Sequence, residues 1–255
     1  MHEELIDAHC HLDFEAFDSD RAKALWRARK NNIRHIIVPG TERKYWLRVR
    51  KLCETDDYLH ACYGLHPYWV AQHTSADVDA LAAYIEKYSP VAVGECGLDF
   101  RKDQADKKSQ LFFFEAQLEL AQHFDLPVVI HAVNATETVL QSIRKHKDLK
   151  GMIHSYSGST EQAKQLVDAG FYISIGGTVT YKDARKIKAV VTEIPLTSLL
   201  VETDAPDQSA ENHKDIRNEP AFLIDTVTAI AELKQQPISA IATQTSKNTK
   251  TLFDI

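Results

Sequence analysis

The hydrophobic pattern of the chain repeats a two-part unit. Short apolar runs, often rich in β-branched residues, alternate with stretches whose apolar residues are three and four positions apart. Eight apolar runs are present: 4–10, 34–40, 59–65, 91–97, 127–132, 151–156, 172–177 and 198–204. Helical spacing is clearest in 19–32, 75–88, 110–124 and 159–170. Helix starts are expected at Ser19, Ser75 and Ser159, because serine is a good N-cap.

Strand followed by helix, eight times over 255 residues, predicts an α/β fold of the (β/α)8 TIM-barrel type. A doubly wound open sheet is the alternative, because periodicity does not show whether a sheet closes. No linker, low-complexity tract or internal repeat divides the chain. We therefore expect one domain over residues 1–255.

Composition narrows the classes of function. The formal net charge of −6 argues against a protein that coats nucleic acid, which requires many phosphates to be neutralised by Lys and Arg. No apolar run is long enough for a bilayer, and acids stand near the N-terminus where a signal peptide would be basic, so a cytoplasmic location without a membrane partner is expected. The four scattered cysteines fit reduced, buried thiols.

Polar residues gather where the predicted strands end, which is the catalytic end of such a barrel. These residues are His9, His11, His66, Glu95, His131, His154 and Asp204. The remaining histidines begin strands or fall elsewhere, and we assign them no catalytic role: His2, His35, His60, His73, His123, His146 and His213.

The segment DAHCHLD (7–13) places two imidazoles two residues apart, on one face of an extended chain. With His131, His154, Glu95 and Asp204 they form the ligand set of a divalent-metal site. Six ligands exceed what one catalytic ion needs, so we expect two divalent ions, and the imidazoles favour zinc, iron, manganese or a similar metal. One ion would take His9, His11 and Asp204 and the other His131 and His154, with Glu95 between them.

Two further roles follow from this arrangement. Asp204 is the expected general base, because a carboxylate at a metal can orient a water molecule and take its proton. His66, one strand away, is expected to donate to a substrate oxygen, although it could also only brace the turn at Pro67.

Seven motifs, taken together and in order, resemble the TatD family of metal-dependent deoxyribonucleases among the amidohydrolase-like TIM barrels. They are DAHCHLD, GLHP, VGECGLDF, LPVVIHA, MIHSYSG, YISIGGTVTY and LLVETDAPD followed by RNEP. The resemblance covers about residue 5 to residue 255. It implies a hydrolase with two metal ions, commonly Mg²⁺ or Mn²⁺ besides the Zn²⁺ that the imidazoles favour, that acts as a 3′-to-5′ exonuclease on single-stranded DNA ends. It also supports the six ligands above and places His66 on the substrate side.

Two positions depart from the family pattern. Val133 stands where the family commonly has an arginine, so a phosphate contact is missing. Cys96 replaces an aliphatic residue and should pack away from the metals. Other phosphate contacts are expected from loop residues Arg101 and Lys182, and Trp69, next to Tyr68, offers a face on which a terminal base can stack.

Two alternatives to a nuclease remain open on the sequence. The same metals can polarise a carbonyl, so a carboxyl ester or amide hydrolase, such as an aminoacyl-tRNA deacylase, fits the ligands equally well. Val133 and the acidic net charge favour this alternative slightly. A metal-stabilised binding protein without turnover is the third reading, and the complete ligand set argues against it. No obligatory protein partner is expected.

Overall fold

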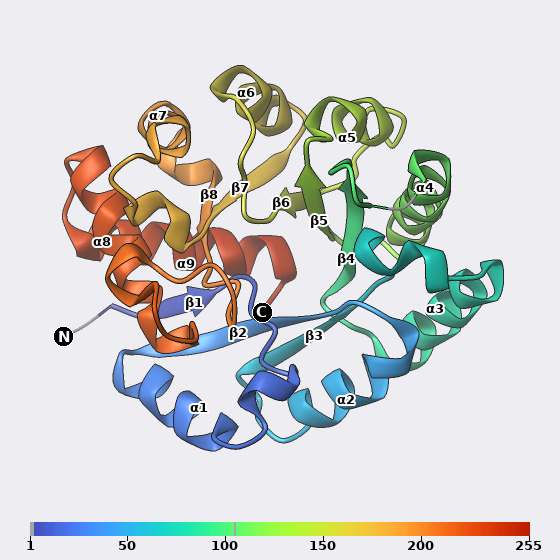
Figure 1. The fold of residues 1–255 in the computed structure, drawn as a ribbon, viewed down its shortest axis with the longest axis horizontal. Coiled ribbons are helices and arrows are strands. Elements are labelled where there is room, and N and C mark those ends of the chain that lie inside the picture. Colours follow the sequence, from blue (N-terminus) through green and yellow to red (C-terminus); the bar gives the residue numbers. More distant parts are fainter. Residues whose placement is uncertain (1–2, 105) are drawn as a thin grey trace.

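One sheet of eight parallel strands forms the centre of the protein, in the order of the sequence (Figure 1). The computed structural model describes residues 3–104 and 106–255. The strands are β1 (Leu5–Asp7), β2 (Ile33–Gly40), β3 (Leu59–Tyr63), β4 (Ala92–Asp99), β5 (Val128–Val133), β6 (Gly151–Ile153), β7 (Phe171–Ile175) and β8 (Leu199–Val201). All eight predicted strands are confirmed.

The chain also joins its first and last strands. The amide of Ala8 donates to the carbonyl of Val201 at 3.0 Å, and the amide of Asp204 donates to the carbonyl of His9 at 2.9 Å. These bonds bring the end of β8 beside the end of β1, so the ring is nearly closed. The (β/α)8 barrel is confirmed and the open doubly wound sheet is excluded.

Helices surround this ring (Figure 1). They are α1 (Arg21–Lys30), α2 (Arg43–Cys53), α3 (Ser75–Tyr88), α4 (Lys107–His123), α5 (Thr136–Ile143), α6 (Thr160–Asp168), α7 (Arg185–Glu193), α8 (Leu223–Lys234) and α9 (Ile238–Phe253). The expected N-cap at Ser159 is confirmed, and its side chain accepts the amide of Gln162 in a capping box. The other two expected caps are wrong by one residue, because Thr74 caps α3, with Ser75 as its first residue, and Asp20 precedes the first residue of α1.

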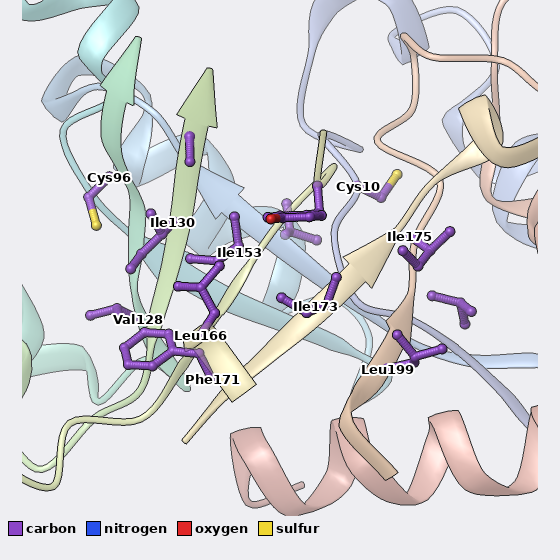
Figure 2. Packing of buried hydrophobic residues seen from close by; sticks show 14 of the residues in the cluster. Cys10, Cys96, Val128, Ile130, Ile153, Leu166, Phe171, Ile173, Ile175 and Leu199 are labelled. Atoms are coloured by element: carbon purple, nitrogen blue, oxygen red, sulfur yellow. The ribbon is translucent and has the colours of Figure 1, made fainter. Parts of the chain in front are cut away.

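Two layers of apolar residues separate the inside of the barrel from its helical coat. Residues between the sheet and the helices form the larger layer, part of which Figure 2 shows around Ile130, Ile153 and Ile173. Inside the ring, a smaller cluster includes Ile37 and Val129, and α9 adds Leu252. Successive strand residues alternate between the two layers, as a strand buried on both faces requires.

This alternation directs polar residues into the mouth of the barrel. Val129 and Met152 lie in the inner cluster, and two residues further along the chain come His131, in β5, and His154, directly after β6. In β4 this alternation is interrupted. Its register with β5 shifts between Val93 and Cys96, as in a β-bulge, and the shift returns Glu95 to the inner face.

The cysteines are packing residues, as expected. Cys10, Cys62 and Cys96 are buried, Cys53 is half-buried, and all four are free thiols. Cys96 points into the outer apolar layer, away from the mouth, where Figure 2 shows it near Ile130. Its thiol donates to the carbonyl of Val129 at 3.6 Å, so its departure from the family pattern leaves the mouth unchanged.

The strand-starting histidines form a pair away from the mouth. Nδ1 of His35 lies 2.8 Å from Nε2 of His60, and Nε2 of His35 lies 3.5 Å from the carboxylate of Glu4, which also binds Lys250. Burial and the neighbouring His35 lower the pKa of His60 to about 4. His60 therefore stays neutral in the fold at pH values where an unfolded histidine is charged.

We expect this pair to make the protein less stable in mild acid. The unfolded state takes up a proton on His60 below its ordinary pKa of 6.5, and the folded state does so only near 4, so stability falls as the pH drops across this window. Because the ring is part-exposed, the loss is about 1 kcal/mol. Urea unfolding of the metal-loaded protein at pH 7 and pH 5 measures it. Between pH 7 and pH 5, the free energy of unfolding should fall less in His60→Gln than in wild type. An equal fall in both proteins would contradict this assignment. His123→Gln, at an exposed residue, is the control.

Within residues 3–104 and 106–255, no helix has both the length and the apolar character needed to cross a bilayer.

Candidate metal centre

Glu95, near the end of β4, is the centre of the polar cluster in the barrel mouth. Its carboxylate is buried, with 1% of the residue exposed. Oε2 lies 3.3 Å from Nε2 of His9 and 3.3 Å from Nε2 of His11. Oε1 faces three other ring nitrogens: Nε2 of His66 at 2.9 Å, Nδ1 of His131 at 3.2 Å and Nε2 of His154 at 2.8 Å. Each carboxylate oxygen therefore has its own group of imidazoles.

The first group fits a metal ion. Nε2 of His9 and Nε2 of His11 are 3.2 Å apart, and Oδ1 of Asp204 lies 3.5 and 3.6 Å from them. Ligand bonds of about 2.0 to 2.2 Å in a tetrahedral arrangement place donor atoms about 3.3 Å apart. Oε2 of Glu95 is buried without a hydrogen-bond partner among the described residues. A buried oxygen that faces two imidazoles and accepts no hydrogen bond is therefore well placed to be a metal ligand.

The strand that carries His9 and His11 is shorter than expected. β1 ends at Asp7, so both histidines follow the strand rather than lying in it. A bend at Ala8 follows the strand, but pairing with β2 continues beyond it, because the amide of Cys10 donates to the carbonyl of Ile37 at 3.0 Å. This continued pairing with β2 keeps both rings on the inner side, as the H-x-H spacing predicts.

A second group of donors gathers at Oε1 of Glu95. Nδ1 of His131 and Nε2 of His154 are 3.0 Å apart, a spacing that again suits two ligands of one ion. His131 turns its other nitrogen, Nε2, to the carboxylate of Asp99 at 3.1 Å. With the proton held on Nε2 by Asp99, Nδ1 keeps its lone pair for a metal.

His66 is equally close to Glu95, but its hydrogen bonds give it a different role. Its Nδ1 accepts the amide of Tyr68 at 3.0 Å, so Nδ1 has no proton. Burial lowers the pKa of His66 to about 4, which leaves the ring neutral with its single proton on Nε2. An Nε2–H group donates and does not ligate. The tautomer therefore favours the substrate-facing role over a role as metal ligand.

Protons compete with metal ions for these ligands. Burial alone would keep the ring of His11 neutral, but Glu95 and Asp204 outweigh it and raise the pKa of His11 to about 9. The same surroundings act on Glu95, whose pKa is held well below its usual range by the histidines despite burial. Because metal ligands must be deprotonated, loading the site releases protons, and metal affinity should rise with pH.

A second layer of buried groups holds these ligands in place, and the sequence reasoning did not identify it. Asp7 accepts the amides of His9 and Thr203 at 3.3 and 2.9 Å and so ties the ends of β1 and β8 together. Glu202 lies 3.5 Å from Nδ1 of His154, and Gln208 donates to Asp204. Glu202 could have been found, because it precedes Asp204 by two residues and shares its face.

Asp99 is the member of this layer with the clearest expected effect. Arg101 binds it through Nε and Nη2, and the hydrogen bonds from His131 and Arg101 hold the pKa of Asp99 below its usual range despite burial. Asp99→Asn removes the negative charge and one of the two acceptor oxygens that hold the proton on Nε2 of His131. We expect a loss of about 10- to 100-fold in metal affinity, measured by competition with a chromophoric chelator. Asp103→Asn, exposed and nearby, is the control, and equal affinity in both variants would contradict the role of Asp99.

Comparison with known proteins decides the family. The family described as TatD related DNase matches residues 6–254. The chain belongs to this family. It is 37% identical over 254 residues to an Escherichia coli K12 protein named uncharacterized metal-dependent hydrolase YjjV, with 98% of each chain covered. The Bacillus subtilis relative YabD, which carries the same description, is 36% identical, with 98% of this chain and 99% of the relative covered.

A solved structure agrees with the fold of this TatD-family chain. The crystal structure of YjjV, described as a TatD homologue from E. coli K12, aligns with a TM-score of 0.95 and 36% identity, and 100% of each chain is covered. Family and relatives together with the clustered ligands show a metal-dependent hydrolase of the TatD family.

The predicted substrate residues of this TatD-family member lie in different places. A pocket of about 240 Å³ opens above the metal centre, and His66 and Trp69 line it together with Tyr68 and Val133. Arg101 does not line this pocket, and its guanidinium is bound to Asp99. Lys182 lines a separate surface pocket beside Thr180 and Glu211. The structure thus brings His66 and Trp69 to the metal centre and leaves Arg101 and Lys182 outside it.

Of the histidines without an assigned role, His2 lies outside the described residues, and none of the others lines the pocket that contains Glu95.

Proposed function

We propose that the protein is a phosphodiesterase that uses two divalent ions, Mg²⁺, Mn²⁺ or Zn²⁺, to remove nucleotides from the 3′ ends of single-stranded DNA. The observation that carries this proposal is the carboxylate of Glu95, which presents one oxygen to His9 and His11 and the other to His131 and His154. Two ligand groups joined by one carboxylate suit a pair of ions. The membership of the TatD related DNase family supports DNA as the substrate.

The ligand residues would divide as the geometry groups them. His9, His11 and Asp204 would hold one ion, His131 and His154 the other, and Glu95 would touch both. Such ions polarise the phosphoryl group, lower the pKa of water and stabilise the charge that develops on the attacking and leaving oxygens.

Two side chains of the chain itself would move or hold protons. Asp204 lies at the edge of the first ligand group, with Gln208 donating to its Oδ2, so Oδ1 faces the histidines and can accept the proton of the attacking water. His66, with its proton on Nε2, can donate to a phosphoryl oxygen. Trp69 and Tyr68 at the pocket rim offer rings for a terminal base.

The pocket is suited to a chain end rather than to a long stretch of DNA. Its lining includes Phe14, Trp69 and Val133, and neither Arg101 nor Lys182 lines it. Affinity that comes from many phosphate contacts falls steeply with salt. We therefore expect contact with one or two nucleotides and only a shallow dependence on salt.

Hydrolysis of a carboxyl ester or amide, such as an aminoacyl-tRNA ester, is the second candidate function. The observation that favours it is Val133, which lines the pocket where the family resemblance leads one to expect an arginine. An apolar wall without a guanidinium accommodates an acyl group as readily as a phosphate.

The test compares both substrate classes on one protein. Protein freed of metal and reloaded with Mg²⁺, Mn²⁺ or Zn²⁺ is mixed with 5′-labelled single-stranded DNA, aminoacyl-tRNA or a simple carboxyl ester. The proposal predicts stepwise shortening of the DNA from its 3′ end, with circular single-stranded DNA left intact. Ester cleavage without any nucleotide release would overturn the nuclease proposal and support the second candidate.

A further inference from the structure

A second cavity lies beside the pocket at the metal centre, where the segments after β5 and β6 lead into α5 and α6. Its volume is about 300 Å³. Val133 lines the metal pocket, and the next residue, Asn134, lines this cavity. Ser155 and Ser157 are divided between the two spaces in the same way. Because consecutive residues are only about 3.8 Å apart, a substrate held at the metal centre can place its next group in the second cavity.

The N-terminus of α5 forms part of the lining. Thr136, Glu137 and Thr138, the first three residues of the helix, all line the cavity. Amide groups in a first helical turn have no carbonyl of their own helix to bind, and Ala135 at the N-cap supplies no side-chain hydrogen bond. The helix dipole adds partial positive charge at this end. This side of the cavity therefore favours an anion.

A buried hydroxyl group in the lining points to a ligand independently of the helix end. Thr136 is only 7% exposed, and no described residue forms a hydrogen bond with its Oγ1. Oγ1 is not sealed in the interior, because it is not one of the fully enclosed polar atoms without a partner. The space to which it opens is this cavity. Buried hydroxyl groups are normally paired, so a group bound in the cavity would complete this one.

The opposite walls add further donors. They come from α6 and α7, which follow α5 around the ring (Figure 1). Lys186 of α7 lines the cavity and forms no ion pair with any described residue. Gln162 of α6 uses its Oε1 to accept the amide of Ser159 at 3.3 Å, so its NH₂ group is available to donate. Ser157 contributes another hydroxyl group. An ammonium group and several neutral donors thus face the same space.

Glu137 is the only acid among the described residues that line the cavity, and its carboxylate is engaged elsewhere. Gln141, one turn further along α5, donates to Oε1 of Glu137 at 3.3 Å. This contact holds the carboxylate along the exposed surface of the helix. Lys186 and the hydroxyl group of Thr136 therefore remain available to a ligand.

We propose that this second cavity binds a phosphate group of the substrate, the one next to the phosphodiester that is cleaved at the metal centre. Lys186 would supply the charge, Thr136 and Ser157 would donate from their hydroxyl groups, and the first amides of α5 would donate from the backbone. The inference rests on the proposed function only for the bond that is cleaved. Contacts to backbone phosphates position a nucleic acid without reading its bases. The subsite would therefore hold the DNA end in register over the metals whatever its sequence.

Binding without turnover tests the subsite directly. Calorimetry on metal-loaded protein compares thymidine 3′,5′-bisphosphate with thymidine 3′-monophosphate, which lacks only the 5′-phosphate. We expect the bisphosphate to bind about tenfold more tightly, because hydrogen bonds to a charged group are among the strongest in proteins. Lys186→Gln and Thr136→Val should each remove most of this gain.

Two further variants are the controls for this measurement. Thr136→Ser keeps the hydroxyl group and should keep the gain. Lys23→Gln makes the same change of charge at an exposed residue of α1 and should also keep it. Equal affinity for the two nucleotides in wild type would overturn the proposal. A gain that persists in both Lys186→Gln and Thr136→Val would overturn it as well, because the phosphate would then bind elsewhere.

Turnover of two dinucleotides separates the subsite from the proposed function. The substrates d(pTpT) and d(TpT) differ only by a 5′-phosphate, which is one nucleotide away from the bond that is cleaved. The proposal predicts a higher kcat/KM for d(pTpT), through a lower KM, and loss of this advantage in Lys186→Gln. If neither dinucleotide is cleaved, the proposed function fails while the comparison of bisphosphate with monophosphate still decides the subsite. Equal cleavage of the two contradicts the subsite alone.

Discussion

Glu95→Gln is expected to abolish hydrolysis and to remove bound metal. The amide keeps the size of the side chain but replaces one charged oxygen with an NH₂ group, which no metal ion accepts as a ligand. Both ligand groups depend on this residue, because its oxygens lie within 3.3 Å of five imidazoles. Loss of several kcal/mol of metal-ion stabilisation corresponds to about a 1,000-fold or greater fall in turnover.

Metal content and rate must be measured together for this variant. We expect fewer than two ions per chain after reloading, with the far-ultraviolet circular dichroism of wild type, because the apolar layers of the barrel do not involve Glu95. Glu119→Gln, an exposed residue of α4, is the matched control. A Glu95→Gln protein that retained wild-type metal content and rate would show that the centre of the site is elsewhere.

Asp204→Asn is the second change with a large expected effect. The variant keeps the volume of the side chain and removes the group that we assign as general base, so turnover should fall by about 100- to 10,000-fold. The backbone tolerates the change, because Asp204 has φ of 54° and asparagine is among the residues that adopt this left-handed conformation readily.

The same variant distinguishes the role of Asp204 as general base from its role as metal ligand. His9, His11 and Glu95 remain, so we expect the metal content to stay near that of wild type while the rate is lost. The measurement is the single-turnover rate on the better of the two substrate classes, with metal determined by mass spectrometry. A wild-type rate would show that another group takes the proton.

Much of the site follows from the sequence because a parallel barrel places every strand end at one mouth. His131 and His154 come two residues after inward-facing Val129 and Met152, so alternation alone directs them inward. The same rule could not place Glu95, because its direction depends on a register shift in β4 that no hydrophobic pattern shows.

Contacts between side chains from distant segments were not predictable in the same way. Asp99 looks like any acid after a strand, and only the fold shows that it holds both His131 and Arg101. This pairing also explains why Arg101, expected at the substrate, is engaged elsewhere. Lys182 fell outside the mouth because the segment after β7 leads it toward α8, where it lines a pocket with Asp225.

The central claim is that two metal ions share Glu95, and anomalous diffraction from crystals soaked in Mn²⁺ or Zn²⁺ tests it most directly. The account predicts two anomalous peaks in the barrel mouth, one in contact with His9, His11 and Oε2 of Glu95, the other with His131, His154 and Oε1. A single peak, or peaks that do not touch Glu95, would contradict it.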